Sequence, residues 1–156
     1  MAYLIPANFL KEVQSIKTVD HKTILPKISI VMPCYNQVDF LERSILSILN
    51  QQYPNFELII IDGGSCDGSL DIIKKYEKYL SFWLSENDSG QSEALNKGFI
   101  KCNGEIYGWL NSDDIYLPNA FKDAAKSLLE NPDKNVVFGD FISIDKQDCI
   151  IDYNHA

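Results

Sequence analysis

The chain is poor in the residues that recognise nucleic acid. Arginine occurs once, at Arg43, and 14 basic residues stand against 22 acidic ones, which gives a net charge of −8 over 156 residues. An acidic excess of this size disfavours binding to a nucleic-acid backbone or to an anionic membrane. The acidity is concentrated after residue 27, where 10 bases oppose 20 acids. The chemistry of the protein is therefore expected in this acidic part.

Histidine and closely spaced cysteine are scarce as well. His21 and His155 lie near opposite ends of the chain and outside every motif described below. This placement disfavours a histidine-dependent hydrolase and a histidine-ligated zinc site. The four cysteines include no CxxC pair, so free thiols in a reducing compartment are predicted.

Long apolar runs are also missing, although 46% of the residues are hydrophobic, enough for the core of one domain. No run approaches the ~18 residues that span a bilayer. The N-terminus does not show the basic-then-apolar order of a signal peptide. We therefore expect a cytoplasmic protein, held at the inner face of a membrane only if partners bring it there.

From residue 27 onward, short apolar runs alternate with helical periodicity. The runs predict strands at 28–32, 56–61, 82–84 and 105–110, with helices over 38–49, 70–80 and 94–99. This alternation is typical of an α/β protein with a Rossmann-like, open, mostly parallel sheet flanked by helices.

Both ends of the chain add elements to this pattern. Residues 1–26 are predicted to form an N-terminal extension with a short helix at 8–16, and 27–156 to form one domain. Beyond residue 114 we predict a helix from Pro118 to Asn131, a strand at 136–138, and a hairpin that pairs 141–145 with 149–153.

Polar residues gather where the predicted strands end. They occur at 33–36 after the first strand, at Asp62 after the second and at 111–114 after the fourth. Each group alone also fits turn and helix-cap chemistry. In an open parallel sheet, however, ligands bind at the carboxyl ends of the strands. Three such groups together predict one shared crevice.

The ligand class follows from missing motifs and from charge. Neither GxGxxG nor GxxxxGK[ST] is present, which disfavours a dinucleotide fingerprint and a P-loop. A diphosphate beside Asp113 and Asp114 requires a divalent cation, Mg²⁺ or Mn²⁺, to cancel the repulsion. The same cation would stabilise a departing nucleoside diphosphate, so transfer of a sugar from a nucleotide-sugar fits this crevice.

Four ordered motifs make the sequence similar to the family 2 glycosyltransferases, which have the GT-A fold. The resemblance runs from about residue 27 to 140. The motifs are MPCYN, IIDGGSCDG, DSGQSEALNKG and LNSDD, at residues 32–36, 60–68, 88–98 and 110–114. Each motif alone is weak, and their order and spacing together carry the resemblance.

The resemblance implies roles for individual residues. It places eight residues in the nucleotide-sugar site: Pro33, Tyr35, Asn36, Asp62, Asp88, Gly90, Asn111 and Asp113. Within this set Asp62 would hydrogen-bond the base, uracil in a UDP-sugar. The metal is assigned mainly to Asp114, with Asp113 nearer the ribose or as a second ligand. Asn111 stands where the family commonly has Asp, which keeps an acceptor oxygen but removes a charge.

The catalytic base is left unassigned. Inverting transfer needs a carboxylate that deprotonates the acceptor hydroxyl, a carbohydrate or lipid-linked alcohol. In relatives this carboxylate comes from a portion well after the metal motif, and only 42 residues follow Asp114 here. Asp140 is the best placed of them, although a turn or an acceptor contact is the favoured interpretation.

Two alternatives to a transferase stay open. One is a catalytically incomplete nucleotide-binding or interaction module of the same fold, because the C-terminal acceptor portion is missing. The other is a nucleotidyltransferase, which is disfavoured because no glycine-rich basic loop follows the first strand. A sheet that ends near Asp152 would leave an unpaired edge, so we also predict a homo-oligomer formed through the C-terminal region.

Overall fold

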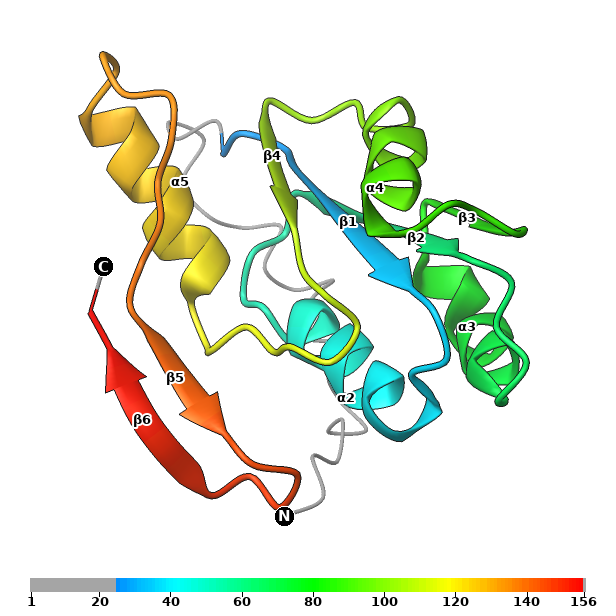
Figure 1. Ribbon diagram of the computed structural model, residues 1–156. Helices are drawn as coiled ribbons and strands as arrows, with labels where there is room; N and C mark the ends of the chain where they lie inside the picture. The colour runs from blue at the N-terminus through cyan, green and yellow to red at the C-terminus, as the bar shows by residue number, and fades with distance from the viewer. Residues whose placement is uncertain (1–24, 156) are drawn as a thin grey trace. The chain divides into compact units, whose positions relative to one another are not determined.

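The computed structural model describes residues 25–155, and the predicted helix at 8–16 lies outside them (Figure 1). The chain divides into two compact units between Lys122 and Asp123, and each is described by itself. The first unit contains a four-stranded sheet and the three helices that cover it. None of the described helices is long and apolar enough to cross a membrane.

The sheet of the first unit is parallel throughout, with the strand order β3-β2-β1-β4. Its two long central strands are β1 (Ile28–Cys34) and β2 (Phe56–Asp62), which pair along their whole length. The shorter strands β3 (Phe82–Ser85) and β4 (Ile106–Trp109) form the edges. The predicted mostly parallel α/β fold is confirmed, because apolar runs in β1 and β2 are buried on both faces.

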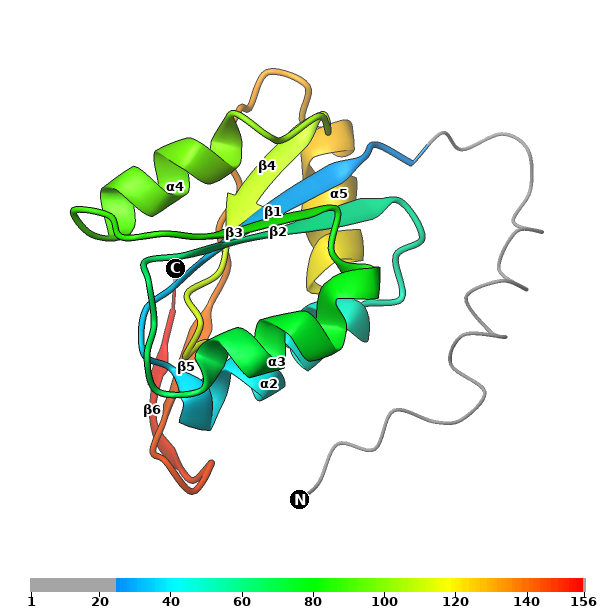
Figure 2. The ribbon, with the colours of Figure 1, turned by 90° about the vertical axis from the view of Figure 1, so that its right-hand side faces the viewer.

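Helices cover both faces of this sheet. The helix α4 (Gln91–Phe99) lies on one face, and α2 (Val38–Leu49) with α3 (Ser69–Tyr76) on the other (Figure 2). A single 3₁₀ turn, η2 (Glu77–Tyr79), follows α3. The predicted helix at 94–99 thus begins three residues earlier, at the glutamine that follows Gly90.

β1 continues to Cys34, two residues beyond the predicted end at Met32. The Gly63 N–H donates to the Cys34 carbonyl of β1, and the Leu110 N–H donates to the Val31 carbonyl. Alternate residues of β1 therefore bond to β2 and to β4. Pro33 faces the β4 side, where pairing has already ended opposite Val31. Without an N–H the proline cannot extend the pairing with β4, but pairing with β2 continues to Cys34, so the proline does not end the strand.

A buried ionic network closes the amino edge of the sheet. Glu57, the second residue of β2, is 4% exposed and forms an ion pair with Lys27 at 2.8 Å. Its other oxygen accepts hydrogen bonds from Ser29 Oγ at 2.5 Å and from the Asn103 N–H at 2.8 Å. The network joins β1, β2 and the turn before β4.

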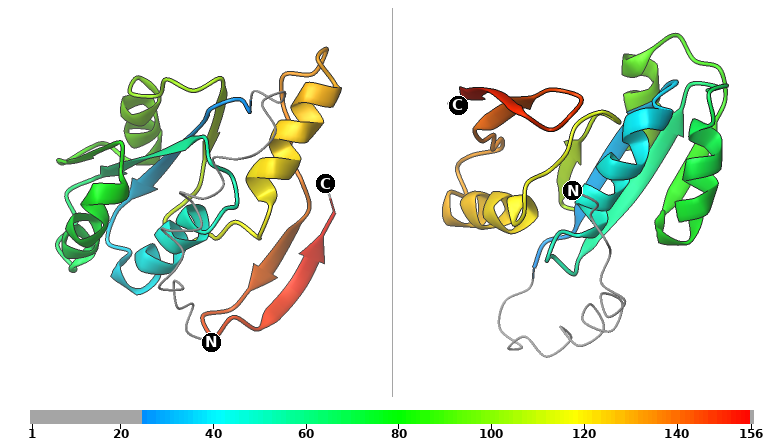
Figure 3. Two further views of the ribbon diagram at one scale, coloured as in Figure 1. Left: turned by 180° about the vertical axis from the view of Figure 1, so that it is seen from behind. Right: turned by 90° about the horizontal axis from the view of Figure 1, so that it is seen from below.

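The second unit contains most of α5 (Ala120–Glu130) and a two-stranded antiparallel sheet. The sheet is the hairpin of β5 (Phe141–Ile144) and β6 (Ile150–Asn154), which Figure 3 shows side by side. The predicted hairpin is thereby confirmed. The predicted strand at 136–138 is wrong, because no strand among residues 25–155 pairs with this apolar segment. Self-association through this region stays a prediction.

Candidate functional site

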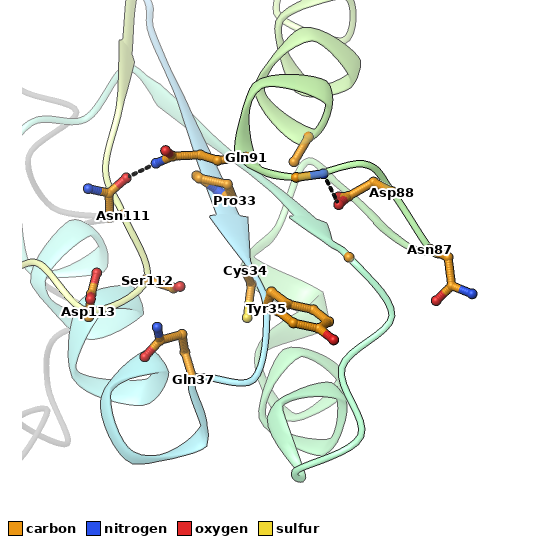
Figure 4. Close-up of a pocket in the computed structure, with 13 residues that line it drawn as sticks. Pro33, Cys34, Tyr35, Gln37, Asn87, Asp88, Gln91, Asn111, Ser112 and Asp113 are labelled. Atoms are coloured by element: carbon orange, nitrogen blue, oxygen red, sulfur yellow. Dashed lines mark hydrogen bonds between the residues drawn. The ribbon is translucent and has the colours of Figure 1, made fainter.

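A pocket of about 590 Å³ opens at the carboxyl edge of the sheet, where the predicted polar groups come together (Figure 4). This volume is within the range of small-molecule sites. The loops after β1, β2, β3 and β4 all contribute to it, together with the first turn of α4. Its lining consists of Pro33, Cys34, Tyr35, Gln37, Gly63, Asn87, Asp88, Gly90, Gln91, Ala94, Asn111, Ser112 and Asp113.

The structure brings six of the eight predicted donor-site residues to this pocket, namely Pro33, Tyr35, Asp88, Gly90, Asn111 and Asp113. Asn36 and Asp62 do not line it, and neither does Asp114, the main predicted metal ligand. Asp140, the candidate base, belongs to the second unit, where its carboxylate lies 3.1 Å from Nδ1 of His155.

Asp62 is fully buried at the end of β2, and its carboxylate is occupied by the loop that follows. Oδ2 accepts hydrogen bonds from the backbone N–H groups of Gly64 and Ser65, at 3.2 and 3.0 Å, and from Ser85 Oγ at 2.7 Å. Oδ1 accepts one from Ser65 Oγ at 2.5 Å. In this structure the carboxylate holds the turn beside the pocket.

Asn36 ties the first loop to the second. Its backbone has φ 52°, in the left-handed region that asparagine tolerates. Its N–H donates to Ser65 Oγ at 2.8 Å, and its side-chain oxygen accepts from the Cys66 N–H at 3.0 Å. These bonds hold the loop that presents Tyr35, whose side chain is 62% exposed, at the pocket.

Gly63 lets Asp88 approach the loop after β2. A Cβ on Gly63 would lie only 3.0 Å from Oδ1 of Asp88. The same Oδ1 accepts a hydrogen bond from the Gly90 N–H at 2.9 Å, drawn as a dashed line in Figure 4. The carboxylate of Asp88 is thereby fixed against the pocket wall.

The loop from Asn111 to Leu117 is held by polar side chains of α2 and of the turn just after it, which the sequence did not single out. Ser44 and Ser47 lie on α2 and Gln51 follows two residues after its end, so the three recur at positions i, i+3 and i+7. Their hydrogen bonds, at 2.9, 3.1 and 3.0 Å, join Ser44 to the Ser112 carbonyl, Ser47 to the Tyr116 N–H and Gln51 to the Leu117 carbonyl. Their spacing puts the three residues on one side, but each partner lies at least 66 positions away, so no local pattern in the sequence indicates these contacts.

Two side-chain amides lead from α4 to this loop. Gln91 Nε2 donates to Oδ1 of Asn111 at 2.6 Å, and Nδ2 of Asn111 donates to Oδ2 of Asp114 at 3.0 Å. Figure 4 shows the first of these bonds crossing the pocket wall from α4. Asp114 is therefore connected to the pocket through Asn111.

Cys34 lines the pocket as an unreactive thiol. Its burial, and then the nearby charge of Asp62, raise the pKa of the thiol to about 12. A thiol must lose its proton to act as a nucleophile or as a metal ligand. Cys34 is therefore neutral at physiological pH and contributes packing to the pocket.

The pocket is acidic, and none of its 13 lining residues is basic. Residues 25–155 contain no group of three or more His, Cys, Asp and Glu side chains arranged to hold a metal. Mg²⁺, however, is commonly held by one or two carboxylates, with phosphate and water oxygens completing its shell. Asp113, which lines the pocket, and its neighbour in sequence Asp114 are carboxylates of the kind that could hold such a cation. The N-terminus of α4, at the pocket wall, adds a partial positive charge for phosphate.

Comparison with known proteins places these features in a family. The sequence model for glycosyl transferase family 2 matches residues 29–148. A glycosyltransferase of Haemophilus influenzae, itself uncharacterized, is 37% identical over 110 residues, which are 69% of this chain and 44% of that protein. The chain thus spans less than half the length of this relative.

Solved structures of other glycosyltransferases are similar in fold to this chain. The crystal structure of Staphylococcus aureus TarS 1-349 in complex with UDP-GlcNAc is similar with a TM-score of 0.63 and 29% identity, over 68% of this chain and 32% of that chain. The mannosyltransferase PcManGT of Pyrobaculum calidifontis, in complex with GDP-Man and Mn²⁺, has a TM-score of 0.63 at 22% identity, over 77% of this chain and 38% of that chain. The expected GT-A fold is confirmed by these likenesses.

Proposed function

Because the chain belongs to glycosyl transferase family 2, we propose that its pocket binds a UDP-sugar with Mg²⁺ or Mn²⁺ for inverting transfer of the sugar to an acceptor hydroxyl. The observation that carries the proposal is an acidic pocket of nucleotide-sugar size that no basic side chain lines. Such a pocket admits a diphosphate only together with a cation. UDP is favoured because TarS, at 29% identity, was crystallised with UDP-GlcNAc.

In this proposal the residues divide between the two halves of the donor. Tyr35 and Pro33 lie along the nucleoside, and the exposed ring of Tyr35 offers a stacking surface for the base. Asp88 and Gly90 form the wall over the ribose and phosphates. Contact of Asp62 with the base stays a prediction, because its carboxylate is buried and already accepts four hydrogen bonds.

Asp113 and Asp114 would hold the cation, which when bound neutralises the diphosphate and stabilises it as the leaving group. Asp113 is exposed at the pocket, whereas Asp114 is held by Asn111. The N-terminal turn of α4 faces the same space and favours the negative charge that develops there.

Calorimetric titration with UDP, in Mn²⁺ and in EDTA, tests the proposal. We expect wild-type protein to bind UDP much more tightly in Mn²⁺, and Asp114→Ala to lose most of this gain. Asp71→Ala is the matched control, because it removes an exposed carboxylate from α3 outside the pocket. Metal-independent binding in the wild type, or an undiminished gain in Asp114→Ala, would contradict the proposal.

Transfer itself needs a separate measurement, because no pocket carboxylate is assigned as the base. Asp88 and Asp113, the two that line the pocket, both have roles toward the donor. Incubation with a radiolabelled UDP-sugar and a panel of carbohydrate and lipid-linked acceptors distinguishes a transferase from a module that only binds nucleotide. Labelled product supports transfer, and tight UDP binding without any product supports the module.

A further inference from the structure

The side-chain amides of Gln91 and Asn111 form a chain of two hydrogen bonds that ends at Asp114, the predicted metal ligand. Asn111 accepts from Gln91 at its oxygen and donates from its nitrogen to Asp114. Each end of the Asn111 side chain is therefore used, and its orientation is fixed by the two partners together. A carboxylate at position 111 could accept from Gln91 but could not donate to Asp114.

The two ends of this chain are anchored in elements on opposite faces of the sheet. Gln91 is the first residue of α4, which packs so closely on β1 that a Cβ on Gly98 would meet Val31 Cγ1 at 2.3 Å. The loop that carries Asp114 is hydrogen-bonded to α2 through Ser44 and Ser112, both buried. The two exposed hydrogen bonds of the amides therefore run between two backbone segments that packing and buried hydrogen bonds hold in place.

On this geometry, and resting on the proposed function, we propose that Gln91 is a positioning residue for the cation. Through Asn111 it fixes the Asp114 carboxylate before any ligand arrives. Asn111 then serves as a neutral bridge between Gln91 and Asp114. Removal of a partner that orients a metal ligand commonly costs about tenfold to a hundredfold in metal affinity.

These two hydrogen bonds also explain why an amide suits position 111. In Asn111→Asp, two carboxylates would face each other where a donor and an acceptor now lie 3.0 Å apart. Like charges at this distance repel unless a cation lies between them. The substitution should therefore make the loop depend on a cation for its order, whereas the wild-type loop is ordered by its own hydrogen bonds.

The first test compares Gln91→Met with Gln37→Met by UDP calorimetry in Mn²⁺ and in EDTA. Both glutamines line the pocket, and only the first donates to Asn111. We expect Gln91→Met to reduce the ratio of UDP affinities with and without Mn²⁺ about tenfold. Gln37→Met should leave this ratio within about twofold, even if it changes both affinities, because it does not act through Asp114.

The second test uses thermal melting without nucleotide. We expect Asn111→Asp to melt about 3 °C below the wild type in EDTA, and Mn²⁺ to restore most of this loss while hardly moving the wild type. An equal melting temperature in EDTA, or no restoration by Mn²⁺, would overturn the bridging role. If wild-type protein shows no Mn²⁺-dependent UDP binding, the proposed function fails. If it shows such binding and Gln91→Met behaves like Gln37→Met, only the positioning role fails.

Discussion

Carboxylates at the amino ends of the parallel strands (the amino edge of the sheet) have different surroundings from those at the carboxyl ends (the carboxyl edge). At the amino edge, Glu57 is buried, paired with Lys27 and hydrogen-bonded to Ser29. At the carboxyl edge, Asp88 and Asp113 line an open pocket without a basic residue in its wall. Glu57, which stabilises the fold, has its counter-charge within the chain, whereas no basic residue lines the pocket beside Asp88 and Asp113, for which we propose a role toward the donor.

Asp62 refines this contrast, because it lies at the carboxyl edge and yet is buried like Glu57. Neutral donors of the backbone and of two serines, Ser65 and Ser85, satisfy it in place of a lysine. The carboxyl edge thus contains a buried carboxylate with its own hydrogen-bond donors, Asp62, and carboxylates that line the pocket, Asp88 and Asp113. Stability and ligand affinity should therefore respond to different residues.

The largest loss of stability is expected for Asp62→Ala. Four donors of the partly buried residues Gly64, Ser65 and Ser85 would lose an acceptor that is itself fully buried, so the free energy of unfolding should fall by about 4 kcal/mol. Urea denaturation followed by circular dichroism measures this change. Asp71→Ala, which removes an exposed carboxylate, should stay within about 0.5 kcal/mol of the wild type. Equal stability of the two variants would show that the Asp62 bonds are dispensable.

Glu57→Leu should cost about 3 kcal/mol, because it leaves the buried Ser29 hydroxyl and the Asn103 N–H without their shared acceptor and Lys27 without its counter-charge. Denaturant titration gives the magnitude. The affinity for UDP in Mn²⁺ should remain within about twofold, since the network lies at the far edge of the sheet. A large loss of UDP affinity in the folded variant would contradict the division between the two edges.

A smaller loss of stability is expected when Glu57 is protonated at acidic pH. Burial alone would raise the pKa of Glu57, but hydrogen bonds from Lys27, Ser29 and Asn103 outweigh it and hold the pKa below its ordinary value. The ionised carboxylate therefore stabilises the fold above the unfolded-state pKa of ~4.3, and this contribution is lost as the pH falls through the lower folded-state value.

Glu57→Gln removes this titration while keeping an acceptor for Ser29 and Asn103. The stability difference between wild type and Glu57→Gln should be constant from pH 7 to about 5 and should shrink below about pH 4. Denaturation curves at a series of pH values measure it. A difference that grows on acidification would mean that the folded-state pKa of Glu57 is raised.

Much of the fold could be predicted from periodicity. The runs of β1 and β2 are apolar on both faces, which indicates a parallel sheet covered by helices, and the structure has this arrangement. The end of β1 was misplaced because the effect of Pro33 depends on which neighbour it faces. The segment at 136–138 has strand composition, but a strand also requires a partner, which local sequence does not supply.

The site was predictable where side chains follow strand ends directly. Six of the residues predicted for the donor site line the pocket because parallel strands bring their carboxyl ends to the same side of the sheet. The roles of Gln91, Ser44 and Gln51 were not predictable, because each contacts a residue at least 20 positions away. Such contacts depend on how α2 and α4 pack against the sheet.

The sequence by itself therefore determined the family, the parallel sheet and the acidic character of the pocket, since motifs, periodicity and charge are local properties. Tertiary structure decided which carboxylates remain available to a ligand. Asp62 and Asp113 are both acidic residues that follow apolar runs, and only packing buries the first among four donors and leaves the second exposed at the pocket. The physical reason is that hydrogen-bond satisfaction depends on neighbours in space.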